Sequence, residues 1–136
     1  MDLIKAIKIS ASGMKAQGVR LRVISENIAN SNSLAETPGG APYRRKLVSF
    51  KEQLDKSIGA QTVGVNKVEF DQSDFGKRYD PTHPAADKDG YVSTPNVNNL
   101  IEMMDMREAQ RSYEANLNII SATRRMIQRT LDILKA

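Results

Sequence analysis

Hydrophobic residues recur every seven positions in the first part of the chain, which is typical of a helix that packs lengthwise against a neighbour. The pattern predicts a helix from about Leu3 to Ala29, and its heptad line consists of Ile7, Met14, Leu21 and Ile28. A second apolar line, on roughly the opposite side, consists of Ile9, Ala16, Val19 and Val23. We therefore expect this helix to contact neighbours on two sides, with close helix approaches at Gly13 and Gly18.

The C-terminal part of the chain predicts a longer helix, from about Asn98 to Leu134, because residues 97–136 contain neither glycine nor proline. Its main heptad column consists of Met106, Tyr113, Ile120, Ile127 and Leu134. Two further columns consist of Met103, Leu117 and Leu131, and of Ile119, Met126 and Ile133. Together the columns cover roughly 160° of the helix surface at about 100° per residue. This arc is wider than the stripe of a two-stranded coiled coil, so we expect more than one helical partner.

The segment between the two helices has a different composition, because all five prolines and six of the eight glycines lie between residues 31 and 96. Short strands are expected at 47–50 and 62–70, and at Tyr91-Val92 after the turn signal Asp89-Gly90. The predicted fold class is mainly α with a small β element, and its long terminal helices are coiled-coil-like. The expected organisation is an N-terminal helix in residues 1–30, a loop-rich middle segment with short β-strands in 31–96, and a C-terminal helix in 97–136.

The chain is basic overall, with a net charge of +4, but the charge is evenly spread. Residues 31–96 carry nine basic and nine acidic side chains. A basic column of Lys8, Lys15 and Arg22 has three interpretations: a solvated face, an ion-pairing seam, or a contact to nucleic acid or lipid. Three cations over two heptads would give only weak, salt-sensitive phosphate binding. A basic helical nucleic-acid-binding protein and a peripheral membrane helix at residues 1–30 are therefore rival hypotheses.

Residue types that carry catalysis or bind metals are scarce in this sequence. There is no cysteine, which excludes disulfides, thiolate metal sites and cysteine nucleophiles. The single histidine, His83, lies between Pro81 and Pro84, and a histidine without a second nitrogen or sulfur ligand makes a poor metal site. We therefore expect no catalytic, cofactor-binding or metal site, and an enzyme centred on His83 is a third rival hypothesis.

The start of the longer helix combines charged and apolar residues. Ordinary surface ion pairing with nearby arginines is expected for Glu102 and Asp105. The methionine cluster of Met103, Met104 and Met106 is interpreted as core at helical spacing, and the alternative is an adaptable binding surface. No apolar run is long enough to span a bilayer, and lysines interrupt the N-terminal apolar residues, so we expect no cleaved secretory signal.

Several short motifs resemble those of a known family. The runs Ser10-Ala11-Ser12-Gly13-Met14 and Glu26-Asn27-Ile28-Ala29-Asn30, together with Tyr113-Glu114-Ala115-Asn116, are similar to the terminal motifs of flagellar rod, hook and hook-associated proteins. Three internal stretches resemble the proximal rod members of this family: Pro42-Tyr43-Arg44-Arg45-Lys46, Asp80-Pro81-Thr82-His83-Pro84, and Pro95-Asn96-Val97-Asn98. One departure is Ser33, near which relatives often have threonine. The motif residues that this resemblance marks are Asn27, Ala29, Asn30, Asp80, Pro81, His83, Pro84, Asn96, Asn98, Glu114 and Asn116.

The resemblance implies a structural subunit of the proximal rod of the bacterial flagellar basal body, and no enzyme. In such proteins the terminal helices pair antiparallel and stack into the inner tube of a hollow shaft that transmits torque. The implied route is type III export from the cytoplasm, without a cleaved signal peptide, to the periplasmic rod. The implied partners are copies of the chain itself, other rod proteins, the rod-to-membrane-ring adaptor and the export apparatus, with no nucleic acid and no small-molecule ligand.

The resemblance and the apolar pattern together predict an assembly seam on the terminal helices. Its residues are Ile7, Met14, Leu21, Ile28, Met106, Tyr113, Leu117, Ile120, Ile127, Leu131 and Leu134.

Overall fold

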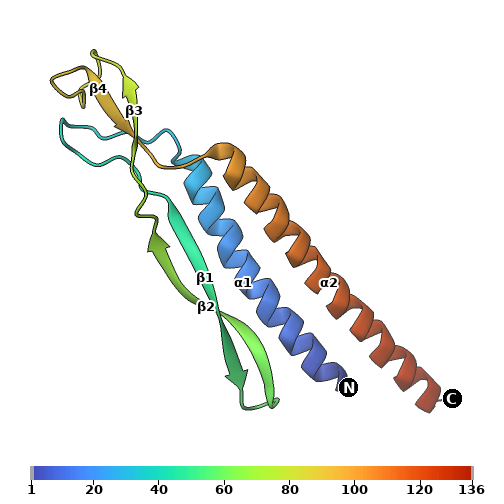
Figure 1. Cartoon of the computed structure of the whole chain (residues 1–136). Coiled ribbons are helices and arrows are strands. Elements are labelled where there is room, and N and C mark those ends of the chain that lie inside the picture. Colours follow the sequence, from blue (N-terminus) through green and yellow to red (C-terminus); the bar gives the residue numbers. More distant parts are fainter. Residues whose placement is uncertain (1, 136) are drawn as a thin grey trace. The chain divides into compact units, whose positions relative to one another are not determined.

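The computed structural model describes residues 2–135, which form two long helices and four strands (Figure 1). The elements in chain order are helix α1 (Leu3–Ala29), strands β1 (Lys46–Asp55), β2 (Ala60–Phe70), β3 (Gly76–Tyr79) and β4 (Tyr91–Thr94), and helix α2 (Asn99–Lys135). The predicted fold class is confirmed, and both helices begin and end within one residue of their expected positions. Neither helix in the described range carries the long apolar stretch that crossing a bilayer would require.

The strands form two separate antiparallel sheets of two strands each, β1 with β2 and β3 with β4. The strands expected at 47–50, 62–70 and 91–92 are confirmed as parts of β1, β2 and β4. Strand β3 was not expected, because its sequence shows no apolar alternation. In the structure all four of its residues are exposed. Tertiary pairing explains this strand: Tyr79 lies opposite Tyr91 in the register, and their rings meet edge to face with centroids 5.3 Å apart.

The chain divides into two compact units, and each takes residues from both helices and from the β1–β2 pair. The first, here called the terminal unit, comprises Met1–Leu21, Val48–Lys67 and Arg107–Ala136. The second, here called the middle unit, comprises Arg22–Leu47 and Val68–Met106. Both ends of the chain therefore belong to the same unit.

In the terminal unit the two helices lie side by side and antiparallel (Figure 1). A Cβ atom placed on Gly13 would lie 2.9 Å from Asn116 Nδ2, while further along the same helix Arg20 forms an ion pair with Glu108 at 3.5 Å. Contacts further along α1 therefore involve earlier residues of α2, as expected for antiparallel helices. The side chains buried between the elements of this unit are small, as Ala16 and Ala109 show. Small side chains allow the two backbones to approach closely. The close approach expected at Gly13 is confirmed, whereas the one expected at Gly18 is wrong, because no atom lies within 4 Å of a Cβ placed there.

The core of the middle unit is also built from small and β-branched side chains. It consists of Ala35, Ala85 and Val92, with Leu34 and Ala86 packed against them. The turn into β4 depends on Gly90, whose φ of 83° is a left-handed conformation that side chains disfavour. This position is also crowded, because a Cβ atom there would lie 2.9 Å from the Tyr79 ring. The turn predicted at Asp89-Gly90 is thus confirmed.

The two glycines of α1 give a matched test of helix packing. Gly18→Ala is expected to raise the free energy of unfolding by about 1 kcal/mol, because alanine favours the helix and no atom lies within 4 Å of the new Cβ. Gly13→Ala gains the same helix propensity, but it must displace the Asn116 side chain, so it should stabilise less or destabilise. Urea unfolding followed by circular dichroism measures both variants. Equal stabilisation by the two would contradict a close helix approach at Gly13.

Candidate functional site

A buried polar network occupies the middle unit, and Asn27 of the N-terminal motif lies at its centre. The Asn27 side-chain nitrogen donates to the Lys46 carbonyl oxygen at 2.9 Å and to Glu102 Oε2 at 3.1 Å. Its side-chain oxygen accepts from the Lys46 backbone N–H at 2.9 Å and from the Tyr43 hydroxyl at 2.9 Å. An amide offers two N–H donors and two lone pairs, so Asn27 is fully hydrogen-bonded. It joins the end of α1 to β1 and to the start of α2.

Arg45 is the cation that compensates the carboxylates of this network. Its Nε lies 2.5 Å from Glu102 Oε1. Its Nη1 lies 3.4 Å from Asp71 Oδ2, and its Nη2 lies 3.5 Å from Asp105 Oδ2. The Glu102 side chain is only 1% exposed. A buried carboxylate is costly unless it is paired and hydrogen-bonded, and Glu102 has both Arg45 and Asn27.

The expectation that Glu102 forms a surface ion pair is therefore wrong. The first turns of α2 are rotated so that Glu102 faces the interior of the middle unit, where Arg45 and Asn27 meet it. The sequence offered no local signal for this contact, because Arg45 is 57 residues away along the chain.

Asn96 of the Pro95–Asn98 motif holds the segment that follows β2. Its side-chain nitrogen donates to the carbonyl oxygens of Asp71 and Ser73, both at 3.2 Å, and to Ser73 Oγ at 3.0 Å. Its side-chain oxygen accepts from the Arg45 backbone N–H at 2.7 Å. Asn96 thus ties this segment to Arg45, which directly precedes β1.

Arg44, the residue before Arg45, holds the same segment. Its guanidinium donates to the Asp71 carbonyl oxygen at 2.8 Å and lies 4.2 Å from the centroid of the Phe75 ring, a cation–π contact. The Ser73 backbone N–H and hydroxyl, and then Arg45, lower the pKa of the Asp71 carboxyl group. Asp71 is thereby held in the charged form that Arg45 requires.

The loop with the single histidine is a compact turn. The Asp80 carbonyl oxygen accepts from the His83 backbone N–H at 3.2 Å, and His83 Nδ1 accepts from the Ala85 backbone N–H at 3.1 Å. The Thr82 hydroxyl donates to Asp80 Oδ1 at 3.0 Å and lowers the pKa of that carboxyl group. Pro81 and Pro84 are exposed beside them. Residues 2–135 contain no group of three or more His, Asp or Glu side chains placed to hold a metal ion.

Other motif residues lie at helix ends and on helix surfaces. Asn98 caps the start of α2, where its Oδ1 accepts from the Leu100 backbone N–H at 3.0 Å. The Asn30 side chain donates to the Glu26 carbonyl oxygen at 2.9 Å, at the end of α1. Asn116 donates to the Ser112 carbonyl oxygen at 3.0 Å, while Glu114 and Ala29 are exposed. Asn98 and Asn30 therefore satisfy backbone groups at helix ends.

The residues expected in the assembly seam differ in exposure. The half-buried ones are Ile7, Met14, Leu21, Ile28, Met106, Tyr113, Ile120 and Ile127. The exposed ones are Leu117, Leu131 and Leu134, with 44–78% of their surface open to solvent. Sequence reasoning missed the column of residues that α2 turns inward. These residues also recur every seven positions, and they are Glu102, Ala109, Asn116 and Thr123. Their spacing was visible, but they are small or polar, so a search for large apolar residues passed over them.

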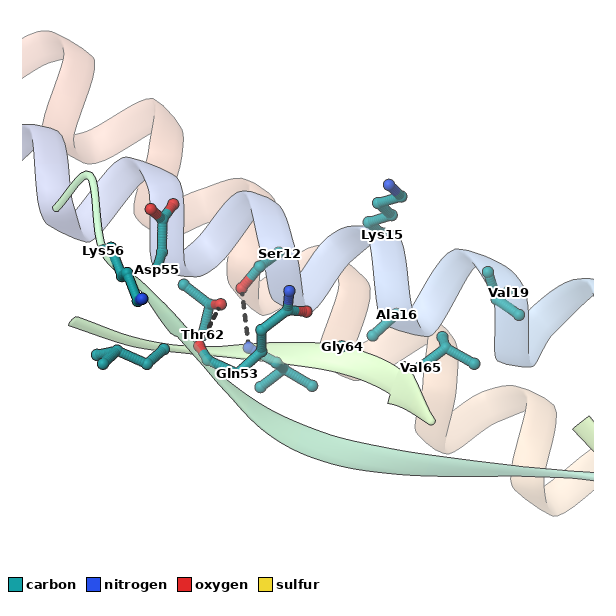
Figure 2. A pocket seen from close by; sticks show the side chains of 12 residues that line it. Ser12, Lys15, Ala16, Val19, Gln53, Asp55, Lys56, Thr62, Gly64 and Val65 are labelled. Atoms are coloured by element: carbon teal, nitrogen blue, oxygen red, sulfur yellow. Dashed lines mark hydrogen bonds between the residues drawn. The ribbon is translucent and has the colours of Figure 1, made fainter. Parts of the chain in front are cut away.

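A groove of about 550 Å³ lies in the terminal unit, between α1 and the β1–β2 pair (Figure 2). Helix α1 contributes Ser12, Lys15, Ala16 and Val19, and the β1–β2 hairpin contributes 53–56 and 62–65. The Ser12 hydroxyl accepts from the Val63 backbone N–H at 3.2 Å and so covers part of the β2 edge. The lining combines apolar, amide and charged groups.

The basic column does not act as one surface. Lys8 donates to Ser57 Oγ at 3.3 Å beside the turn between β1 and β2, whereas Arg22 lies 3.9 Å from Glu26 on its own helix. Lys15 lines the groove and extends away from the strands in Figure 2. The three cations therefore have three different surroundings.

Removing the cation of the buried network tests its contribution. Arg45→Ala is expected to lower the free energy of unfolding by about 3 kcal/mol, because it leaves the Glu102 carboxylate buried without its cation. Arg78→Ala is the control, since Arg78 forms an exposed ion pair with Asp80 at 3.4 Å and should cost no more than about 0.5 kcal/mol. Urea unfolding measures both losses. If the two variants lost equal stability, the buried network would not have the proposed importance.

Comparisons with known proteins agree with these motifs. Residues 7–33 match the model of the flagella basal body rod protein family, and residues 88–133 match that of the flagellar basal body rod FlgEFG protein C-terminal region. The flagellar basal-body rod protein FlgC of Agrobacterium fabrum is 54% identical, over 98% of this chain and 96% of its own length. The FlgC proteins of Bacillus subtilis and Salmonella typhimurium are 39% and 37% identical and cover 99% and 98% of this chain, and 100% and 98% of their own lengths. Because such relatives span nearly the whole sequence, the chain belongs to the FlgC family of flagellar basal-body rod proteins.

Proposed function

We propose that this structural rod subunit assembles through the outward apolar faces of its terminal helices into the proximal rod, a hollow shaft that transmits torque. The observation that carries the proposal is the apolar surface of α2. In the terminal unit this surface consists of Leu117, Ile119, Met126, Leu131, Ile133 and Leu134, each 44–78% exposed. Exposed apolar surface of this extent marks contacts with other molecules.

The arrangement of these residues supports neighbours on more than one side of α2. Ile119, Met126 and Ile133 recur every seven positions and form one column, while Leu117 and Leu131 lie on another side of the helix. The face turned to α1 is a third side, with Ala109 and Asn116. A helix that packs against its own partner helix and exposes two further apolar faces is suited to a tube of subunits, where each helix has several neighbours.

The proposed partners follow from the family. Other rod proteins and further copies of this chain would cover the apolar faces of α2 in the basal body. The relatives are themselves named as flagellar basal-body rod proteins, which supports rod subunits as partners. By the motif resemblance we extend the proposal to the rod-to-membrane-ring adaptor, and to the type III export apparatus as the route to the periplasmic rod.

Mass spectrometry of purified flagellar basal bodies from the source cell tests the function directly. The chain is expected there at a stoichiometry comparable to that of the other rod proteins. Its absence from basal bodies that contain the other rod proteins would contradict the proposal, and DNA-binding and lipid-binding assays would then test the rival hypotheses.

A single charge on the exposed face of α2 tests the assembly surface. Leu117→Asp is expected to change the free energy of unfolding by less than about 0.5 kcal/mol, because Leu117 is exposed in the subunit. It should nevertheless abolish swimming, since assembly would bury an unpaired carboxylate. Asn118→Asp adds the same charge at the next exposed position, outside the apolar columns, and should retain swimming. Motility assays in cells that lack the native copy separate the variants, and a fully motile Leu117→Asp strain would contradict the packing proposal.

A further inference from the structure

The first turns of α2 expose four apolar side chains within five residues. They are Leu100, Ile101, Met103 and Met104, here called the start patch, and each is 49–68% exposed. The sequence favoured a core position for these methionines, but Met103 and Met104 are on the surface. Only Met106 of the cluster is half-buried.

The buried network fixes the direction of the start patch. At about 100° per residue, the four side chains cover an arc of about 160° whose centre lies opposite Glu102. Glu102 is held by Arg45 and Asn27, and the Asn98 side chain caps the helix four residues before it. The rotation of these turns is therefore set, and the methionine pair must face away from the middle unit. Its exposure follows from the packing of a neighbouring residue.

The start patch shares a heptad register with the proposed assembly surface, although Gln110 and Arg124 occupy the intervening positions. Met103 belongs to the same heptad column as Leu117 and Leu131, and all three are about half exposed. An apolar helix face of a neighbouring rod subunit is therefore the occupant to which the spacing points. Methionine is suited to such a contact, because its thioether is flexible and polarisable.

The same thioethers are chemically vulnerable while the subunit is unassembled. A peroxide or hypochlorous acid transfers one oxygen atom to the sulfur lone pair, forming an S–O bond while the oxidant's O–O or O–Cl bond breaks. The sulfur loses two electrons; hydrogen peroxide leaves as water, and hypochlorous acid leaves as chloride and a proton. The product, methionine sulfoxide, is polar. Methionine sulfoxide reductases reduce it back to methionine, so the oxidation is reversible.

We propose that Met103 and Met104 are a sulfoxidation site that controls incorporation of the subunit into the rod. Oxidation converts the start patch from an apolar to a polar surface, and the neighbouring helix face no longer docks on it. Reduction restores the apolar surface. This inference rests on the proposed function, because it takes assembly as the step that oxidation blocks.

Site mapping on the purified full-length chain tests the chemistry. Graded hydrogen peroxide is applied, and tandem mass spectrometry follows the sulfoxide at each methionine. Met103 and Met104 are expected to oxidise at least about threefold faster than Met14 and Met106, which are half-buried and act as internal references. Equal rates at Met104 and Met106 would overturn the proposal, because the exposed pair would then have no special reactivity.

Incorporation in cells tests the consequence. Strains that lack the native copy express either Met103→Leu/Met104→Leu or the matched double variant Met14→Leu/Met106→Leu. Both also carry Met126→Leu, which removes the other exposed thioether of α2. Each strain receives a peroxide pulse during rod assembly, and mass spectrometry compares subunit content of basal bodies with and without peroxide.

Peroxide is expected to lower incorporation of Met14→Leu/Met106→Leu at least about tenfold, because an unpaired sulfoxide oxygen buried in an apolar contact loses its hydrogen bonds to water. Incorporation of Met103→Leu/Met104→Leu should fall by less than about twofold, since leucine has no sulfur to oxidise. An equal fall in both strains would overturn the inference and leave the rod function standing. Absence of the native chain from untreated basal bodies would instead refute the proposed function.

Discussion

A buried carboxylate at the start of α2 constrains the middle unit more than any other group. Glu102 is almost fully enclosed, so its charge must be met by Arg45 and its remaining hydrogen bond by Asn27. Glu102 and its two partners come from three separate parts of the chain, which are thereby brought to one place. Replacing such a network by apolar residues is often neutral for stability, so its value here is that it specifies one orientation of α2. The motif residues Asn96 and Asn98 extend this control to the adjoining segment and to the helix start.

The second constraint is the close contact of the two helices in the terminal unit. Gly13 faces Asn116, and Ala16 and Ala109 are buried, so the backbones approach where side chains are small. This packing leaves several large apolar residues of α2, such as Leu117, Ile119 and Leu131, about half exposed in the subunit. A single enzyme domain would usually turn such residues inward, whereas a subunit of an assembly can keep them for its neighbours. The same packing that stabilises the monomer therefore prepares the surface on which we propose the rod is built.

The candidate site illustrates how motif residues can be structural. His83, Asp80 and Thr82 bond to each other and to nearby backbone, and Asn27 uses its whole amide group inside the fold. A rod subunit must keep its shape under torque, and rigid turns, helix caps and satisfied buried amides serve that need. The exposed methionines stand apart from this group, because half or more of each of these residues is open to partners and to oxidants alike.

The sequence by itself determined the helices, the turn at Gly90 and most of the strands, because heptad spacing and the placement of glycine and proline act locally. The family is also evident from the sequence, since its motifs are short contiguous runs of residues. Only the tertiary structure decided which heptad column of α2 turns inward. The inward column is Glu102, Ala109, Asn116 and Thr123, and not one of the columns of larger apolar residues. The physical reason is that close antiparallel packing favours small side chains, and that a buried carboxylate must reach a cation 57 residues away. Strand β3 likewise depends on its pairing with β4, in which Tyr79 lies opposite Tyr91, and local sequence does not encode this pairing.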